Sequence, residues 1–272
     1  MSYDTLTETE WEDVNQVYDL LEKGEVERAR LRLDGLMQKR PDHPDLRIVD
    51  AAVCLDEGDP ARALAALKGA ERSADPSLFF HLRAVAHFEM VHLEQARDDA
   101  ERALAIQPDL ADVHELLSRI HEHLGHHEQA EEHAAEAQAL EPEVFGPPLD
   151  VSDEEFDALV EQAVAKLPDE VRRHLDEVPV LVEALPRHEV LTAEDPPLSP
   201  DLLGLFVGRH LLERSHTDVP GVPGAIFLFR RNLLRACGDR EELEREVRIT
   251  VQHEVGHLLG LDDDDLDRWG LA

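Results

Sequence analysis

Two histidines and a glutamate near the C-terminal end of the chain have the spacing of a metal site. His253 and His257 lie four positions apart, so on a helix both side chains share one face and can reach one ion. Glu254 lies beside them, where its carboxylate can take a proton from water held by the metal. By residue frequencies, this HExxH pattern alone arises by chance in roughly one chain in ten of such composition.

Two further residues, Gly260 and Asp263, make the pattern more specific. Glycine permits a left-handed turn at a helix end, which would bring Asp263 back as a third ligand. Three protein ligands and one open position are typical of a catalytic zinc site. When both residues are required, chance occurrence falls to about one chain in two thousand. Any of Asp262–Asp265 could be the ligand, with Asp263 favoured, or all four could form a solvated acidic tail.

The residues before the motif predict the helix that positions it. Asp239 is a suitable N-cap, with Glu242 three positions further on. The apolar residues at helical spacing are Leu243, Val247, Val251, Val255 and Leu258. The polar residues that share another face are Glu246, Thr250, His253 and His257. We therefore expect a helix over about residues 240–259, with one buried stripe and one metal-binding face.

Length, charge and cysteine usage limit the functions open to the chain. Its 272 residues suit two domains of ordinary size. A formal net charge of −34 would repel nucleic acid and anionic membranes, so neither is expected as a partner. Cys54 and Cys237 are far apart, which indicates buried free thiols in a reducing compartment. Because no secretory signal or membrane-spanning apolar run is found, we expect a soluble cytoplasmic protein.

The N-terminal half contains a repeat with a period near 34 residues. Its markers are a turn residue, an alanine five positions later, and a proline twelve or thirteen positions after the alanine. In order, these markers are Gly24, Gly58, Val91 and Gly125; Ala29, Ala63, Ala96 and Ala130; and Pro41, Pro76, Pro108 and Pro142. Glycine ends the first helix of a pair, alanine lets the second approach closely, and proline stops the second.

This pattern resembles the tetratricopeptide repeat and predicts about four repeats, over roughly residues 9–144. The resemblance implies an α-solenoid that holds a protein or peptide partner in a groove lined by the first helices. In the fourth repeat that face would present Asp112, Glu115, Arg119 and Glu122, which favours a basic or mixed-charge ligand. We interpret six histidines there as mostly solvated helix surface: His114, His121, His123, His126, His127 and His133.

Helix breakers after the repeats predict a linker over residues 146–151, which separates a repeat domain at 1–145 from a second domain at 152–272. In the second domain we expect helices over 152–166 and about 168–177, and strands at 178–183, 203–208 and 225–229. Ser152 and Glu155 form a capping box for the first of these helices. The predicted class is therefore α+β overall and mostly α, with a small mixed α+β second domain.

The second half resembles a family of small bacterial zincin-like metallopeptidases. The segments that carry the resemblance are Leu202–Gly208, Glu213–Ser215, Ile226–Arg230, Thr250–Gly260 and the ending Asp263…Leu266…Gly270. The resemblance implies a minimal zincin fold, zinc bound by His253, His257 and Asp263, and Glu254 as the base. Unlike metzincins, the chain has an aspartate as third ligand and no methionine after the motif.

Better-known zincins pair an edge strand beside the site with an extended peptide substrate. By this resemblance, the candidate strand consists of Ile226, Phe227, Leu228 and Phe229. A peptidase site also needs a donor to the tetrahedral oxyanion, and the candidates are Arg214, His216 and Arg230.

The sequence therefore predicts a zinc metallopeptidase that hydrolyses peptide bonds through a metal-activated water, with repeats that recruit a protein partner or substrate. The alternative is an interaction scaffold whose zincin-like domain binds metal or peptide with little or no turnover. The presence of Glu254 favours the enzyme, because a binding-only site has no chemical need for that carboxylate.

Overall fold

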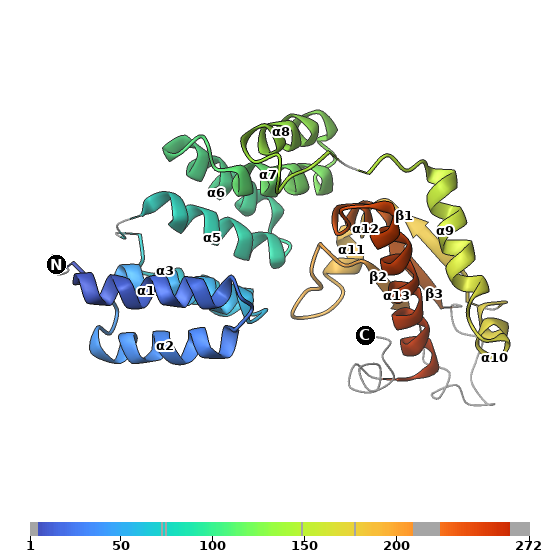
Figure 1. Ribbon diagram of the computed structural model, residues 1–272, viewed down its shortest axis with the longest axis horizontal. Helices are drawn as coiled ribbons and strands as arrows, with labels where there is room; N and C mark the ends of the chain where they lie inside the picture. Colours follow the sequence, from blue (N-terminus) through green and yellow to red (C-terminus); the bar gives the residue numbers. More distant parts are fainter. Residues whose placement is uncertain are drawn as a thin grey trace. The chain divides into compact units, whose positions relative to one another are not determined.

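The computed structural model describes residues 5–71, 73, 75–147, 149–176, 178–208 and 224–261 (Figure 1). The chain divides into two units, Met1–Phe145 with Leu191–Ser199, and Gly146–Val190 with Pro200–Ala272. The first is a helical repeat region and the second combines helices with a small sheet. The predicted class, α+β and mostly α, is confirmed. Within the described residues, no helix combines the length and apolar character needed to cross a membrane.

The repeat region consists of consecutive helix pairs in which each helix packs most closely against its partner. The pairs are α1 (Glu8–Leu21) with α2 (Val26–Lys39), α3 (Pro44–Asp56) with α4 (Pro60–Leu67), α5 (Pro76–Glu89) with α6 (Leu93–Ile106), and α7 (Ala111–His123) with α8 (His127–Leu140). They follow one another along the chain from blue to green in Figure 1. The four pairs confirm the four predicted repeats.

The residue that was predicted to end the first helix of each pair adopts the left-handed conformation. Gly24, Gly58 and Gly125 have φ angles of 70°, 74° and 76°, and Val91 takes the same role at 58°. A β-branched residue rarely adopts positive φ, so the third turn is strained relative to the others. The predicted alanines at the helix crossings, Ala29, Ala63, Ala96 and Ala130, are 0–3% exposed.

One proline departs from its predicted role. Pro41, Pro108 and Pro142 follow the ends of α2, α6 and α8, as expected. Pro76 instead opens α5, where its missing N–H is harmless in the first turn. The helix that it was expected to stop, α4, already ends at Leu67.

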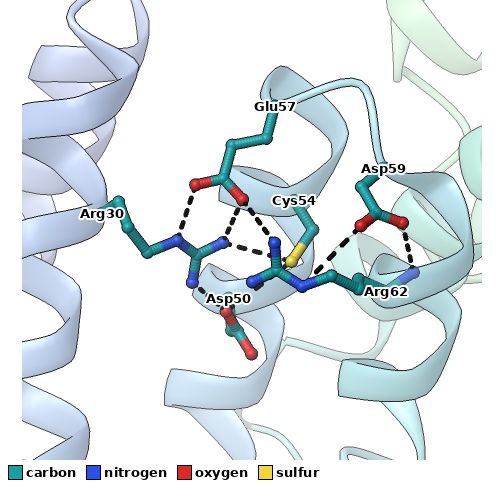
Figure 2. Close-up of polar contacts among 6 residues, drawn as sticks. All are labelled: Arg30, Asp50, Cys54, Glu57, Asp59 and Arg62. Atoms are coloured by element: carbon teal, nitrogen blue, oxygen red, sulfur yellow. Dashed lines mark hydrogen bonds and ion pairs between the residues drawn. The ribbon is translucent and has the colours of Figure 1, made fainter.

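A polar network joins the first helix pair to the second (Figure 2). Arg30 on α2 forms ion pairs with Asp50 on α3 and with Glu57, the C-cap residue of α3, and its Nε lies 2.8 Å from Glu57 Oε1. Its Nη2 also lies 3.2 Å from the Sγ of Cys54. Burial raises the pKa of the Cys54 thiol, and both Cys54 and Cys237 are buried free cysteines. Cys54 therefore belongs to the packing between repeats and does not have the environment of a reactive thiolate.

The second unit is built on a short mixed sheet. Its elements are α9 (Asp153–Ala165), α10 (Asp169–Arg172), the 3₁₀ helix η1 (Arg173–Asp176), β1 (Val180–Glu183), α11 (His188–Leu191), β2 (Gly204–Val207), β3 (Ala225–Phe229), α12 (Arg230–Arg235) and α13 (Arg240–Leu259). The capping box at Ser152 and Glu155 is confirmed. Helix α13 packs against α9, β2 and β3 around one apolar core.

The strand order corrects the prediction of a substrate-pairing strand at Ile226–Phe229. In the sheet formed by the described strands the order is β1-β3-β2, so β3 is central. Ile226 pairs with Val180 of β1 on one side and with Phe206 of β2 on the other. Both hydrogen-bonding edges of β3 are therefore occupied, and an extended peptide has no edge there to pair with.

Candidate metal and catalytic site

Helix α13 carries the HExxH residues, and local signals define both its ends. At its start, the Asp239 side chain accepts a hydrogen bond from the Glu242 amide, 2.9 Å away. At its end, Gly260 adopts the left-handed conformation with φ 86°, as predicted. The five residues of the predicted apolar stripe are 0–3% exposed. The helix is therefore anchored along this apolar stripe, while the side chains of His253 and His257 are partly exposed.

The two histidines converge on one point. The Nε2 atoms of His253 and His257 are 3.0 Å apart, and the rings meet edge to face. Two nitrogens bound to one tetrahedral zinc at 2.0–2.1 Å lie about 3.3 Å apart. The pair thus needs only a few tenths of an ångström of adjustment to hold such an ion.

The other ring nitrogen of His257 points back to the helix end. Its Nδ1 lies 3.3 Å from the carbonyl oxygen of Leu261. The Leu261 amide in turn donates to the Gly256 carbonyl, 3.0 Å away, in the turn that Gly260 makes. When Nδ1–H donates to this carbonyl, Nε2 keeps its lone pair, which is the arrangement that orients histidine ligands in metal proteins.

Glu254 is buried between the helix and the sheet, with an exposed fraction of 6%. Its Oε2 accepts a hydrogen bond from the backbone amide of Phe206 in β2, at 2.6 Å. Beside this contact, β2 approaches α13 closely at Gly204. A β-carbon there would lie 2.6 Å from Thr250 Cγ2 and 3.0 Å from Glu254 Cγ. The carboxylate next to the histidine pair is therefore held by the sheet.

Residues 175–271 match the model of a family described as zincin-like metallopeptidases. The C-terminal domain belongs to this family. The match spans β1, β2, β3 and α13, and α13 carries the histidine pair and the glutamate. None of the curated proteins compared with the chain matches it.

Solved structures resemble the part of the chain outside the zincin-like domain only loosely. A MamA double mutant is 21% identical, with 51% of this chain and 78% of that chain covered and a TM-score of 0.41. A crystal structure of MamA is 19% identical, with coverages of 55% and 81% and a TM-score of 0.41. PilW, a type IV pilus biogenesis factor, is 12% identical, with coverages of 57% and 83% and a TM-score of 0.35. At these scores the likenesses add nothing to the helix pairs described above.

Several predicted residues of the zincin-like site lie outside the described residues. These are Arg214, His216 and Asp263, together with the neighbouring aspartates of Asp262–Asp265. Among the residues that are described, no group of three or more His, Cys, Asp or Glu side chains is arranged to hold a metal ion. The third candidate donor, Arg230, forms an ion pair with Asp153 at 2.5 Å, near the start of α9.

The histidines of the fourth repeat, far from the zincin-like motif in sequence, are not mostly solvated as predicted. His121 is 6% exposed, and its Nδ1 lies 3.2 Å from that of His126. The Nδ1 atoms of His114 and His133 are 3.0 Å apart, and the His121 and His133 rings stack. Burial, and then the neighbouring His114 and His121, lower the pKa of His133 to about 4. The helix pair α7 and α8 packs these rings together, which a single-helix pattern does not reveal.

Sequence reasoning also missed the contribution of β2 to the zincin-like site. The sequence predicts a strand at 203–208 and a family resemblance over Leu202–Gly208, but it gives these residues no chemical role in the site. The structure gives two of them a physical role, because Phe206 donates to Glu254 and Gly204 allows the close approach. A glycine inside a predicted strand was the available signal, since such glycines mark places where another chain segment comes close.

Proposed function

We propose that the zincin-like domain is a zinc-dependent peptidase. In this proposal His253, His257 and Asp263 bind the ion, and Glu254 is the general base. The observation that supports it most directly is the convergence of the two Nε2 atoms at 3.0 Å on a helix that also carries a buried glutamate.

In the proposed reaction the zinc ion, Glu254 and His257 have separate roles. A bound zinc ion would act as a Lewis acid and make water acidic near neutral pH. Glu254 would accept a proton during attack on the peptide carbonyl and pass it to the leaving amine. Its burial away from bulk water and its bond to Phe206 limit the orientations open to the carboxylate. His257 would keep its Nε2 lone pair available through its contact with Leu261.

We propose β2, instead of β3, as the strand beside which an extended peptide substrate lies. Among the described strands β2 is at the sheet edge and β3 is not. Strand β2 also contacts α13 directly at Thr250 and Glu254. A peptide along this strand would therefore run past the general base. Because the Phe206 amide already donates to Glu254, the other main-chain groups of β2 would hold the peptide in an extended form.

For the helical repeats we propose recruitment of a protein partner or substrate. Helix pairs stacked in series present an extended surface suited to this purpose. The formal net charge of −34 favours a partner with basic segments, because acidic ones would be repelled. The second candidate function remains a scaffold that binds metal or peptide without appreciable turnover.

The test of catalysis is Glu254→Gln in the full-length, zinc-loaded protein, assayed on a library of unstructured peptides. We expect zinc content near that of the parent and a loss of about 10²–10⁴-fold in the cleavage rate, as for removal of a general base. The matched control is Glu244→Gln, an exposed position on the same helix, which should leave the rate unchanged. Cleavage that persists at the parental rate in Glu254→Gln would contradict the assigned role.

A further inference from the structure

Strand β2 lies so close to α13 that one of its positions has no room for a side chain. The β-carbon of an alanine at Gly204 would lie 2.6 Å from Thr250 Cγ2, 3.0 Å from Glu254 Cγ and 3.2 Å from Glu254 Oε1. Thr250 cannot yield easily, since it is 6% exposed and its Oγ1 donates to the Glu246 carbonyl at 2.9 Å. A β-branched side chain is stiff about χ1, and the hydroxyl bond to Glu246 holds Thr250 in the rotamer that points Cγ2 at Gly204.

Two residues further along β2, the backbone reaches the same carboxylate. The Phe206 amide donates to Glu254 Oε2 at 2.6 Å, so this N–H serves the glutamate and not the ladder to β3. The hydrogen bond to β3 at this end of β2 is made by Leu203. Its carbonyl oxygen accepts from the Phe229 amide, 2.9 Å away. Hydrogen bonds from an amide to a carboxylate are shorter and stronger than those between neutral groups.

We infer that Gly204 and the backbone amide of Phe206 are the positioning elements of the Glu254 carboxylate. The amide fixes Oε2 on the strand, and the missing β-carbon at Gly204 leaves the space in which the side chain lies. The expected effect on catalysis rests on the proposed function. The hydrogen bond between Phe206 and Glu254 does not depend on that function. It also gives a role to the segment Leu202–Gly208, which the metal chemistry does not use.

The consequence for catalysis follows from the distances. Because Thr250 is fixed, an alanine at residue 204 must push β2 away from α13 until the 2.6 Å contact reaches an ordinary distance of 3.4 Å or more, which is a shift of about 0.8 Å. Misplacement of a reacting group by about 1 Å costs on the order of 10²-fold in rate. We therefore expect Gly204→Ala to lower kcat by about 10²-fold per zinc-loaded molecule.

The contact is tested spectroscopically, without any need for turnover. The full-length protein contains eight phenylalanines, so selective ¹⁵N labelling of phenylalanine yields few amide signals, and Phe206→Leu identifies the one of interest. In the parent we expect a strongly downfield, slowly exchanging Phe206 amide. It should move upfield and exchange rapidly in Glu254→Ala and Gly204→Ala. In Glu254→Gln, whose neutral amide oxygen is a weaker acceptor, it should move only part of the way upfield and stay protected. In Gly146→Ala, where an added β-carbon meets nothing within 4 Å, it should stay in place.

Rescue separates positioning from a general loss of structure. Thr250→Ser removes the Cγ2 methyl but keeps the hydroxyl that bonds to Glu246. The double variant Gly204→Ala/Thr250→Ser should therefore restore the Phe206 amide signal and most of the lost kcat. The inference is overturned if Glu254→Ala leaves the parental Phe206 amide unchanged, or if Gly204→Ala retains both the amide signal and kcat. A parent that cleaves no peptide but shows the protected amide refutes the peptidase proposal and leaves the positioning contact standing.

Discussion

The histidine cluster of the fourth repeat predicts that the repeat region loses stability in mild acid. Burial, together with His114 and His121, lowers the pKa of His133 from 6.5 to about 4. Between pH 6.5 and about pH 4, the His133 ring is protonated in the unfolded chain but stays neutral in the folded protein. The stabilisation is therefore complete above about pH 6.5 and is lost as the pH falls toward about 4.

The size of the effect follows from the same two values. Each pH unit below the ordinary pKa of 6.5 lowers the free energy of unfolding by at most about 1.36 kcal/mol. Lowering the pH from 7 to about 5.3 therefore costs at most about 1.6 kcal/mol. Because the ring is half-buried and solvent screens part of the repulsion, we expect about 1 kcal/mol. This interval also stays above the isoelectric point, near 4.6. The assay is urea unfolding followed by circular dichroism, at both pH values, in the parent and in His133→Gln.

The comparison with the variant isolates the contribution of His133. His133 lies among His114, His121 and His126, and three charged residues of α6 act on His121: Arg97, Glu94 and Glu101. In His133→Gln we expect the loss between the two pH values to be smaller than in the parent by about 1 kcal/mol. His127→Gln, at an exposed position in α8, should behave as the parent does. An identical pH dependence in parent and His133→Gln would refute the reasoning.

Two further substitutions test the packing of the repeats. Asp99 is 4% exposed and accepts two bonds of 2.6 Å from Arg83, so Asp99→Ala should cost about 3 kcal/mol of unfolding free energy; a loss below 1 kcal/mol in urea unfolding would show that this ion pair is unimportant. Gly58 has φ 74° and open space around it, so Gly58→Ala should cost about 1 kcal/mol through backbone strain alone. An unchanged or raised melting temperature in Gly58→Ala would contradict the left-handed turn.

The features that could be predicted from sequence are those that local signals determine. The limits of α13 follow from Asp239 at one end and Gly260 at the other, and both caps are present. The helix pairs follow from a repeated glycine, alanine and proline spacing, because each marker acts on its own turn or crossing. Even Val91, which replaces the expected glycine, keeps the left-handed turn, since the surrounding helices determine the backbone there.

The features that could not be predicted depend on contacts between distant segments. The central position of β3 results from pairing with strands on both sides, and a strand pattern alone does not specify its neighbours. The burial of His121 arises where α7 packs against its neighbours, although its sequence surroundings look polar. The bond between Phe206 and Glu254 joins residues 48 positions apart. Its only local sign was the glycine at residue 204.

The central claim is that His253, His257 and Asp263 hold one zinc ion. The direct measurement is zinc per chain, by elemental analysis of full-length protein purified without a metal-binding tag, in the parent, His257→Ala and Asp263→Ala. We expect about one zinc per chain in the parent and loss of the ion in both variants, as for a site with three protein ligands. Zinc retained in Asp263→Ala would assign the third ligand to another residue. No zinc in the parent, even after the metal is added, would contradict the account and leave a repeat-based binding protein.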